Sequence, residues 1–359
     1  MIETSNDSYL HQQKGLANLW YPFSFVHEVK TAKPLRRIIL GIPIVLWRLK
    51  NFSYKAFVDR CPHRQAPLSA GKLANNKISC PYHGWEFNQE GRCVHIPSMP
   101  QAHKLCKKIS LQEIRVEEDQ DFLWICINNK DENNFPDNQT FSKRKTIPKS
   151  WKRVHLQKIF HVEIEDLIEN FMDSPHTAFV HSGLIRKKSK PKPRQFSIEM
   201  KENEVSVEYE PKQESLGFFN KVVNPHNEAV FHQERFIAPS LVEISYHFGR
   251  LGGNFNAFLA LAPIGPKETR LFISIGLDFS WLNHPIAIAI KLLAKIILAQ
   301  DAWILGQQRS NYDLSTDYSK KSILTDSIDI YVRHLRARMR QGKSSSVQFK
   351  KKRKLEAFF

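Results

Sequence analysis

Short runs of apolar residues, separated by Gly, Pro and Asn turns, dominate the first third of the chain. Runs of this length that are bounded by turn residues predict β-strands, whose side chains alternate between two faces. The pattern therefore predicts a small all-β domain. Its expected strands are Arg37–Trp47, Tyr54–Val58, Lys77–Ser79 and Phe122–Ile127.

The second half of the chain has a different pattern. Several of its strand-like runs alternate apolar and polar positions, as expected for a sheet with one covered face. These runs are His155–Glu165, Glu204–Tyr209, Val230–Ile237, Leu241–Phe248, Phe255–Ala262 and Arg270–Phe279. Helices are predicted around Asp166–Val180, Pro285–Ser310 and Ile328–Met339. Strands in one block with helices at its ends favour an α+β domain over a doubly wound one.

The segment Pro285–Ala299 is very apolar, but it is shorter than the ~20 residues that cross a bilayer. Lys291 and Lys295 interrupt it at an i,i+4 spacing, so both lie on one helix face. Two interpretations stay open. The segment is either a core helix with a solvated lysine stripe or a helix that lies on a membrane surface, in peripheral contact and helped by a basic tail.

A polar stretch, Asn128–Ser150, separates the two regions. It lacks apolar periodicity and contains two prolines, as linkers often do. A chain of 359 residues is also long enough for two domains with real cores. We therefore predict a first domain over residues 18–130, a linker over 131–150, a second domain over 151–340 and a basic tail over 341–359.

Charge is the one extreme of the composition. Fifty-three Lys and Arg residues face 36 Asp and Glu residues, which gives a formal net charge of +17. Much of the excess lies in two runs, Arg186–Arg194 and Lys343–Lys354. Such patches attract nucleic acid, an acidic redox protein or an anionic membrane. No nucleic-acid recognition motif accompanies the charge, so we expect no nucleic-acid partner and a solvated, disordered tail.

The N-terminal residues lack the basic and apolar segments of a secretory signal. The five cysteines are sparse, odd in number and unevenly spaced, which argues against a disulfide framework. We therefore expect a cytoplasmic protein, with peripheral membrane contact as the variant, whose cysteines are metal ligands or buried thiols.

Two short segments carry the strongest metal-binding pattern. Cys61-Pro62-His63 is followed sixteen residues later by Cys80-Pro81-Tyr82-His83, so each segment supplies one thiolate and one imidazole. A mononuclear zinc site is one interpretation, but zinc fingers usually place two cysteines in one segment and two histidines in the other. One Cys and one His per segment instead suits a two-iron cluster, in which one iron takes both thiolates and the other both imidazoles.

The run CPHRQAPLSAGKL…CPYHGWEFNQEGRCVHIP resembles the N-terminal domain of the Rieske non-haem iron oxygenases. The resemblance implies a Rieske [2Fe-2S] cluster held by Cys61, His63, Cys80 and His83. Neutral imidazoles in place of two thiolates raise the reduction potential above that of an all-cysteine ferredoxin. Trp85 is expected to shield the cluster. The other cysteines are expected to be buried thiols: Cys93, Cys106 and Cys126.

A second candidate metal site follows the linker, in Asn170–His181. His176 and His181 are five residues apart, which on a regular helix separates them by about 140°. Convergence on one metal needs a local irregularity, and Pro175 and the trailing Ser182-Gly183 are residues that produce one. Taken alone, two histidines at this spacing are more often unrelated side chains.

The pattern N-x2-D-x2-H-x4-H of this segment resembles the mononuclear iron motif of the same oxygenases. Two histidines and one carboxylate form a facial triad that leaves positions open on Fe(II). We expect the carboxylate to be Asp301, because an acid on a mostly apolar helix face needs a partner or a metal. Asp313 and Asp317 are the alternative candidates.

The resemblance implies a different role for Asp173. In the family, the acid of this motif hydrogen-bonds a ligand histidine of the mononuclear iron and a Rieske histidine of the neighbouring subunit, here His83. This arrangement implies a head-to-tail ring, a homotrimer, in which electrons cross between subunits. Asn170 also matches the motif and is expected near the iron without binding it.

The same resemblance implies a monooxygenase. A ferredoxin or a flavin reductase supplies electrons singly, O2 binds at the iron, and one oxygen atom enters a small apolar substrate while the other leaves as water. No G-x-G-x-x-G segment follows a strand, so we predict a separate electron donor instead of a bound nicotinamide or flavin.

The N-terminal segments WYPF, LWR and DRCPHRQAPLSAG resemble the group that includes vanillate demethylases and pheophorbide a oxygenase. This group implies hydroxylation or oxidative demethylation of an aromatic or polycyclic substrate. On a strand, Phe255, Ala257 and Leu259 share one face and Phe258 lies on the other, and either face is a candidate pocket wall. The run Arg186–Arg194 is expected in a solvated loop, with attraction of a substrate carboxylate as the alternative.

The expected fold class is therefore α+β, an all-β Rieske domain followed by a helix-grip-like catalytic domain with an antiparallel sheet. A Rieske electron-transfer or redox-sensing protein without oxygenase activity is the alternative function. The presence of His176, His181 and Asp301 together argues against that alternative.

Overall fold

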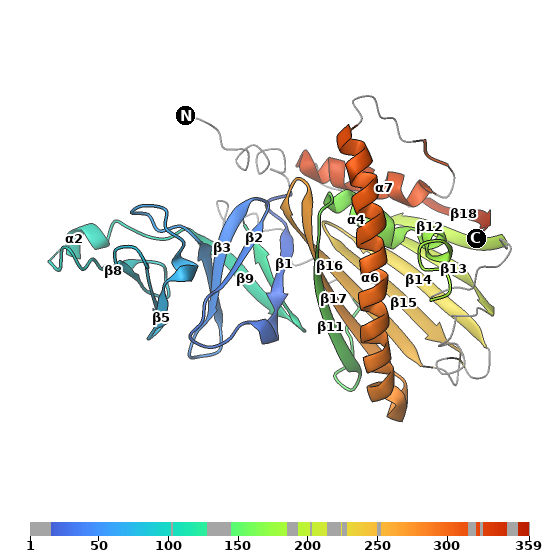
Figure 1. The fold of residues 1–359 in the computed structure, drawn as a ribbon, viewed down its shortest axis with the longest axis horizontal. Coiled ribbons are helices and arrows are strands. Elements are labelled where there is room, and N and C mark those ends of the chain that lie inside the picture. Colours follow the sequence, from blue (N-terminus) through green and yellow to red (C-terminus); the bar gives the residue numbers. More distant parts are fainter. Residues whose placement is uncertain are drawn as a thin grey trace. The chain divides into compact units, whose positions relative to one another are not determined.

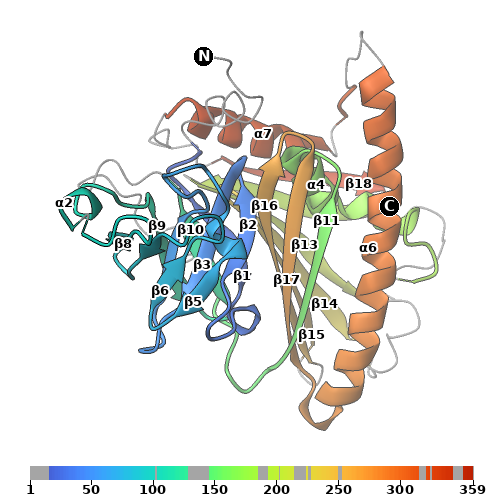
Figure 2. The same ribbon diagram turned by 60° about the vertical axis from the view of Figure 1, so that its left-hand side comes forward.

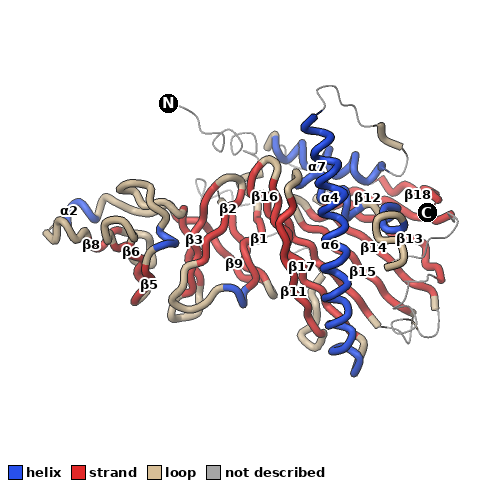
Figure 3. Tube along the Cα trace, viewed as in Figure 1, coloured by secondary structure: helices blue, strands red, loops and turns tan. Residues whose placement is uncertain are grey.

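The computed structural model describes residues 16–101, 103–127, 145–184, 193–201, 203–213, 224, 228–249, 253–314, 321–323, 326–342 and 351–358. The chain divides into two compact units, Met1–Phe141 and Ser142–Phe359. Antiparallel strands dominate both units and the helices belong mainly to the second (Figure 3). The predicted α+β class is therefore confirmed.

The first unit contains two antiparallel sheets (Figure 1). The larger sheet has the order β1-β10-β9-β4-β3-β2, and the smaller has the order β5-β6-β7-β8. The strands are β1 (Trp20–Phe25), β2 (Leu35–Ile39), β3 (Ile42–Arg48), β4 (Tyr54–Val58), β5 (Lys72–Ala74), β6 (Lys77–Ser79), β7 (Glu86–Phe87), β8 (Cys93–His95), β9 (Glu113–Asp119) and β10 (Phe122–Cys126). The helical segments are short: η1 (Val26–Glu28), η2 (Leu68–Ala70) and α2 (His103–Cys106).

The single strand predicted over Arg37–Trp47 is wrong, because a tight hairpin divides it into β2 and β3. Leu40 and Gly41 form the turn, with φ of 52° and 78°. A two-residue hairpin of this kind needs positive φ at both positions, which leucine rarely adopts. Gly41 is suited to such a turn, but Leu40 continues the apolar pattern into it, so the pattern alone hides the hairpin.

The second unit is built on one eight-stranded antiparallel sheet, in the order β11-β17-β16-β15-β14-β13-β12-β18 (Figure 2). Along β14, every second residue from Val230 to Phe236 is buried, while the residues between them are partly exposed. This alternation confirms a sheet with one well-covered face. The strands are β11 (Lys152–Phe160), β12 (Pro193–Lys201), β13 (Glu204–Gln213), β14 (Ala229–Ile237), β15 (Leu241–Phe248), β16 (Asn254–Gly265), β17 (Glu268–Asp278) and β18 (Lys351–Phe358).

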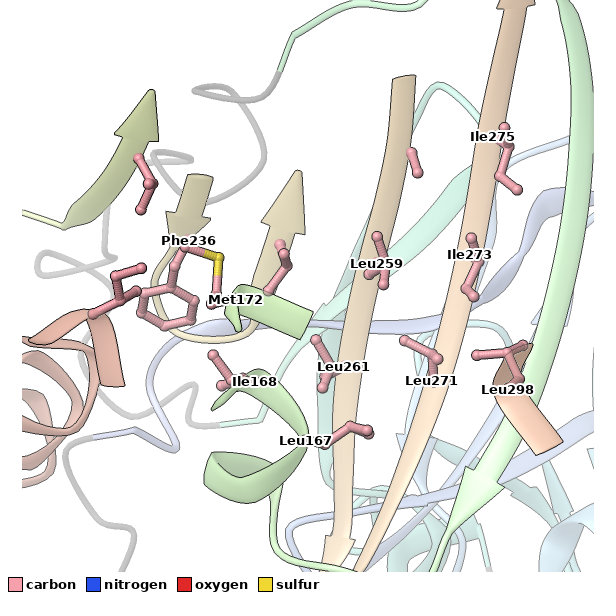
Figure 4. Packing of buried hydrophobic residues seen from close by; sticks show 14 of the residues in the cluster. Leu167, Ile168, Met172, Phe236, Leu259, Leu261, Leu271, Ile273, Ile275 and Leu298 are labelled. Atoms are coloured by element: carbon pink, nitrogen blue, oxygen red, sulfur yellow. The ribbon is translucent and has the colours of Figure 1, made fainter. Parts of the chain in front are cut away.

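Helices α4 (Ile164–Met172), α6 (Asn283–Leu314) and α7 (Ser327–Arg340) share one apolar core with this sheet. Short 3-10 helices, η3 (Ser174–Ala178) and η5 (Ser280–Leu282), lie beside α4 and α6 in the chain. Burial of apolar surface in this core is the main stabilising term of the unit. Figure 4 shows its centre, formed by Leu167, Ile168, Met172, Leu259, Leu261, Leu271, Ile273 and Leu298.

A buried ion-pair cluster fixes α4 against α7. Arg336 is 1% exposed, and its Nε donates to Glu165 Oε1 at 2.9 Å. Arg340 also donates to Glu165, and Arg333 donates to Asp166 at 3.0 Å. Burial alone raises the pKa of Glu165, but the two arginines outweigh burial and lower it to about 2. The segment that leads into the predicted iron motif is therefore held by charges more than 160 residues away in the chain.

The basic C-terminal segment is not wholly a disordered tail, and that expectation is wrong for Lys351–Phe358. These residues form β18, which pairs with β12 at the edge of the large sheet. Leu355 is buried opposite Phe196. This buried cross-strand pair stabilises a strand that the lysine content alone disfavours.

Helix α6 extends beyond the predicted Pro285–Ser310 at both ends. Lys291 and Lys295 are exposed on it, as predicted. Among the helices that the structure describes, none has the combined length and apolarity needed to cross a membrane.

Candidate metal centres and active-site cavity

The two predicted cluster-binding segments are loops with the same backbone hydrogen bonds. In each loop, the amide of the cysteine, Cys61 or Cys80, donates to the carbonyl five residues later. The amide four residues later, from Gln65 or Gly84, donates back to the cysteine carbonyl, and all four distances are 2.8 to 3.0 Å. Gln65 and Gly84 both have positive φ, 59° and 70°. Each loop therefore closes on itself through its own backbone.

The side chains of these loops divide by exposure. Cys61 and Cys80 are buried, whereas His63 and His83 are exposed, with ring centroids 4.6 Å apart. Trp85 stacks on the His63 ring at 4.7 Å with an interplanar angle of 3°, so it covers one side of this imidazole. The structure thus brings the four predicted ligands together, with sulfur inside and nitrogen outside.

The donor set fits a two-iron cluster. Burial and the adjacent Cys80 raise the pKa of Cys61 to about 11, so this thiol stays protonated near neutral pH unless a positive charge stabilises the thiolate. A coordinated metal supplies that charge and deprotonates such a thiol. A cluster with one buried and one exposed iron would match the division of sulfur and nitrogen ligands.

Asp59 anchors the first loop and was missed by the sequence analysis. The carboxylate is buried and accepts from the amide and the hydroxyl of Ser69, at 2.8 and 2.6 Å. It also accepts from Arg36 Nε at 2.9 Å. Asp59 stands two residues before Cys61, so this network fixes where the ligand loop begins.

The remaining cysteines are buried, as expected. Cys126 donates from its thiol to the Asn18 carbonyl. Cys93 and Cys106 lie with their sulfur atoms 3.5 Å apart, a pairing that their sequence positions did not predict. Their burial raises the pKa of Cys93 to about 12, which makes this thiol unreactive as a nucleophile.

The second predicted motif has the irregularity that its spacing requires. Helix α4 ends at Met172, and Pro175 lies in the first turn of the 3-10 helix η3, which contains His176. His181 follows in a turn just beyond η3. The predicted helix Asp166–Val180 is therefore replaced by a helix, a break and a 3-10 turn, and the break allows the two imidazoles to converge.

The structure brings His176, His181 and Asp301 together. One ligand atom from each lies within 4.8 Å of the others. Asp301 Oδ1 is 3.1 Å from His181 Nε2 and 3.7 Å from His176 Nε2. It is a buried oxygen without a hydrogen bond of good geometry. Two imidazoles and one carboxylate oxygen that face one another in this way fit a mononuclear Fe(II) site.

The far side of each imidazole has its own partner. His181 Nδ1 lies 2.9 Å from Gln300 Oε1, and His176 Nδ1 hydrogen-bonds the Asp173 carbonyl. Such partners fix the ring orientation and leave Nε2 for a metal. Gln300 was not predicted, although its place directly before Asp301 was a visible signal.

Asp173 lies beside this site. Its Oδ2 is 3.8 Å from His176 Nδ1, and 43% of its side chain stays exposed. Burial of the remainder and the nearby carboxylates of Glu234, Asp326 and Glu169 raise the pKa of Asp173 to about 7. Asn170 is buried one turn earlier on α4. Both residues flank the predicted iron ligands without joining them.

Of the two alternative acids, Asp313 does not belong to this cluster. Asp313 lies in the last turn of α6 and accepts from Lys267 and Arg309 at 2.8 and 2.7 Å. Asp317 lies outside the described residues, as does most of the run Arg186–Arg194.

A cavity of about 260 Å³ opens at the three converging side chains. Phe255, Ala257 and Leu259 line it, which answers the question of which β16 face meets the cavity. Phe258 is buried on the opposite face. The other apolar walls come from α6 and neighbouring strands, including Ile244, Phe248, Ile273, Ile290, Leu293 and Ile297.

Comparison with known proteins agrees with this architecture. Residues 19–114 match the Rieske [2Fe-2S] domain, and residues 160–342, half of the chain, match the vanillate O-demethylase oxygenase C-terminal domain. Methylxanthine N3-demethylase NdmB of Pseudomonas putida is 25% identical over 334 residues, covering 90% of this chain and 89% of that protein. Protein TIC 55 of Pisum sativum is 32% identical over 165 residues, covering 45% of this chain but only 29% of that protein.

The fold is also found in solved structures. The crystal structure of dicamba monooxygenase bound to dicamba superposes with a TM-score of 0.74 at 21% identity, covering 91% of this chain and 98% of that one. This likeness confirms the predicted two-domain fold. With both domains matched, the chain belongs to the Rieske non-haem iron oxygenases, in the family defined by the vanillate O-demethylase oxygenase C-terminal domain.

Proposed function

We propose that this chain is the oxygenase component of a Rieske monooxygenase. It would use O2 and external electrons to hydroxylate or oxidatively demethylate an apolar aromatic or polycyclic substrate. The observation that carries the proposal is the convergence of His176, His181 and Asp301 at one end of an apolar cavity. In this proposal the first domain spans residues 18–130, the linker 131–150 and the catalytic domain 151–340.

The proposed metal groups have separate tasks. Cys61, His63, Cys80 and His83 would hold the [2Fe-2S] cluster, and His176, His181 and Asp301 would hold Fe(II), which supplies an open coordination position for O2. The protein around them does the remaining work. Gln300 orients His181, and the apolar walls place the substrate and exclude water.

An electron carrier without oxygenase activity is the weaker alternative. Such a protein needs neither the three converging ligands nor a cavity of substrate size next to them. Glu, Asp and His side chains buried together in an apolar wall are costly unless they bind something. The arrangement therefore favours catalysis at the second site.

Iron analysis tests the metal assignment. We expect three irons per chain and a Rieske-type EPR signal after reduction with dithionite. His176→Ala should lose one iron and keep that signal, whereas Asp313→Ala, an exposed acid of α6, should keep all three. Two irons in both the wild type and His176→Ala would leave only an electron carrier, and zinc without a signal would reject the assignment.

Product analysis tests the reaction class. The holoenzyme, with ferredoxin, ferredoxin reductase and NADPH, would be given vanillate, dicamba and caffeine, the kinds of compound named among the relatives. Demethylation of a methoxy group consumes O2, two electrons and two protons, and yields a hydroxyl group, formaldehyde and water. We expect either formaldehyde or a hydroxylated product, and the hydroxyl group of a hydroxylated product should contain labelled oxygen from O2. Reduction of O2 without formaldehyde and without a labelled hydroxylated product would contradict the proposal for these compounds.

We also propose the head-to-tail homotrimer and the role of Asp173 as the link to His83 of the next subunit. Exposure of both His83 and part of Asp173 supports this proposal, because each is open to a neighbour. An electron donor with an acidic surface suits the net charge of +17. Asp173→Asn should keep the trimer and the iron content but slow reoxidation of the cluster by O2. A monomer in sedimentation would contradict the ring.

Helix α6 supports the proposed peripheral membrane contact. Ile288, Leu292, Ile296 and Trp303 form an exposed apolar row with exposed fractions of 48% to 66%. Lys291 and Lys295 flank this row, so an anionic bilayer matches both its apolar and its charged parts. We expect flotation with phosphatidylglycerol vesicles but not phosphatidylcholine vesicles, and loss of flotation in Leu292→Ser/Ile296→Ser. No flotation with either would leave the predicted cytoplasmic location without membrane contact.

A further inference from the structure

The active-site cavity contains an acidic side chain that the metal sites do not use. Glu234 lies on the covered face of β14, is 4% exposed and lines the same cavity as His176 and Asp301. Its neighbours on this face of the strand are His232 and Phe236, and the cavity walls from α6 and the adjacent strands are mostly apolar, with Asp173 and the proposed iron ligands at one end. An acid in such a wall needs a partner for each oxygen, because an unpaired polar group there costs free energy.

Two side chains on the same face of the sheet lie beside Glu234, and one of them hydrogen-bonds it. The Tyr209 hydroxyl donates to Glu234 Oε2 at 3.3 Å, and His232 Nε2 lies 3.1 Å from Oε1. The His232 ring is itself fixed between Tyr209 and Tyr246, at centroid distances of 4.5 and 4.2 Å and angles of 9° and 10°. These three rings lie opposite one another on adjacent strands, so the sheet register sets the position of the carboxylate.

The fixed carboxylate keeps acceptor capacity on its cavity side. A carboxylate has about four lone-pair positions, and the contacts with Tyr209 and His232 leave others for a ligand. A ligand carbonyl or carboxylate at this point would place one hydrogen-bond acceptor against another. A ligand N–H or O–H would instead donate a hydrogen bond to Glu234. Sites built to accept such a hydrogen strongly reject analogues that lack it.

We propose that Glu234, positioned by Tyr209 and His232, binds an N–H or O–H group of the substrate. The substrate class is then an apolar ring system with one hydrogen-bond donor. This inference rests on the proposed oxygenase function and narrows it. It also disfavours a substrate carboxylate at this end of the cavity.

Three probes of nearly equal shape test the inference. Indole carries a ring N–H, indene replaces it with a CH2 group, and 1-methylindole blocks it. Equilibrium dialysis of the anaerobic holoenzyme measures binding without turnover. We expect wild type to bind indole at least about tenfold more tightly than indene or 1-methylindole, the effect of about one hydrogen bond to a charged group.

Variants assign the preference to Glu234. Glu234→Leu should bring the indole-to-indene ratio close to one, and Tyr209→Phe should reduce it. Glu208→Gln is the matched control, because Glu208 precedes Tyr209 on β13 and points to the opposite face of the sheet; it should keep the wild-type ratio. Glu234→Gln preserves size, so if Glu234→Leu fails to fold, a lowered ratio in Glu234→Gln carries the same conclusion.

The inference would be overturned if wild type bound all three probes equally or bound none of them. An unchanged indole-to-indene ratio in both Glu234 variants would also overturn it. Because dialysis needs neither electrons nor O2, its result is independent of the iron and product measurements. A protein that forms labelled product without donor preference would reject only this inference. A protein with donor preference and no second-site iron would reject only the oxygenase.

Discussion

The four proposed cluster ligands lie between Cys61 and His83, whereas His176 and Asp301 of the proposed second site are 125 positions apart in the chain. In the first site, short loops close through their own backbone hydrogen bonds. In the second, the ligands come from a broken helix and from α6, which meet only because both pack on the same sheet. The first geometry is local, and the second depends on the whole unit.

Exposure differs between the two sites as well. His63 and His83 lie at the surface, while His181 and Asp301 are 1% exposed. A site that passes electrons between proteins needs an accessible edge, whereas oxygen chemistry on a substrate needs water excluded. The contrast implies that damage to one site should leave the other intact, which can be tested directly.

The largest effect is expected for Cys61→Ser. Serine lacks the soft thiolate that iron-sulfur clusters require, so both cluster irons and all electron supply should be lost. The second site should keep its single iron, because its ligands lie in the other compact unit. Iron analysis with EPR checks this, with Cys126→Ser as control. Loss of all iron would show that the second site depends on the first.

Asp301→Ala is expected to have the reciprocal effect. It removes the oxygen that both imidazole nitrogens face, so the second iron should be lost and the Rieske signal kept. Activity should fall by more than the roughly 10- to 100-fold that follows loss of a group supporting a metal ligand. Product formation and iron content check this against Asp313→Ala. An unchanged iron content would mean that another acid is the ligand.

The difference between the sites also explains what could be predicted from sequence. The sequence spacing of Cys61, His63, Cys80 and His83 was enough to predict how their side chains are arranged, because each loop is closed by hydrogen bonds within a few residues. Asp301 was identified through its helix face and the family resemblance, and the structure brings it to His181. Gln300 and Glu234 were missed, because their roles depend on which side chains the fold places opposite them.

Two errors in the fold have the same cause. Half of the turn at Leu40–Gly41 has no sequence signal, because positive φ at Leu40 is set by the pairing of β2 with β3. The strand Lys351–Phe358 forms because β12 offers it an edge, with Phe196 opposite Leu355. The local sequence of each segment does not show which strand it will pair with.

Arg336→Met tests how far the second site depends on distant contacts. It leaves Glu165 buried without its fully buried cation partner, which should cost about 3–5 kcal/mol of unfolding free energy. The second unit should unfold earlier in denaturant and retain less of the second iron, while the Rieske signal stays. Lys295→Met, an exposed cation of α6, should change stability by less than about 0.5 kcal/mol. Equal iron loss in both variants would contradict the dependence.

The same ion pair predicts a pH dependence. The pKa of Glu165 is about 2 when folded, against an ordinary value of 4.5. A lowered pKa contributes stability above pH 4.5, and this contribution is lost as the pH falls from 4.5 towards 2. The shift corresponds to about 3 kcal/mol. Denaturant titrations of the second unit should show this loss in wild type and a much smaller one in Glu165→Gln; equal losses would assign the acid sensitivity to other groups.

The smallest effect separates the two cluster loops from each other. Gly84 and Gln65 occupy the same position with positive φ, but only one of them is a glycine. Gly84→Ala adds a Cβ in a disfavoured conformation and 3.0 Å from Pro97, which should cost about 1–2 kcal/mol. Gln65→Gly removes the same strain but raises the conformational entropy of the unfolded chain. We therefore expect the unfolding free energy to change by no more than about 1 kcal/mol. Thermal unfolding followed by the Rieske absorption measures both. A larger loss in Gln65→Gly than in Gly84→Ala would mean that the Gln65 side chain, and not the backbone turn, holds the first loop.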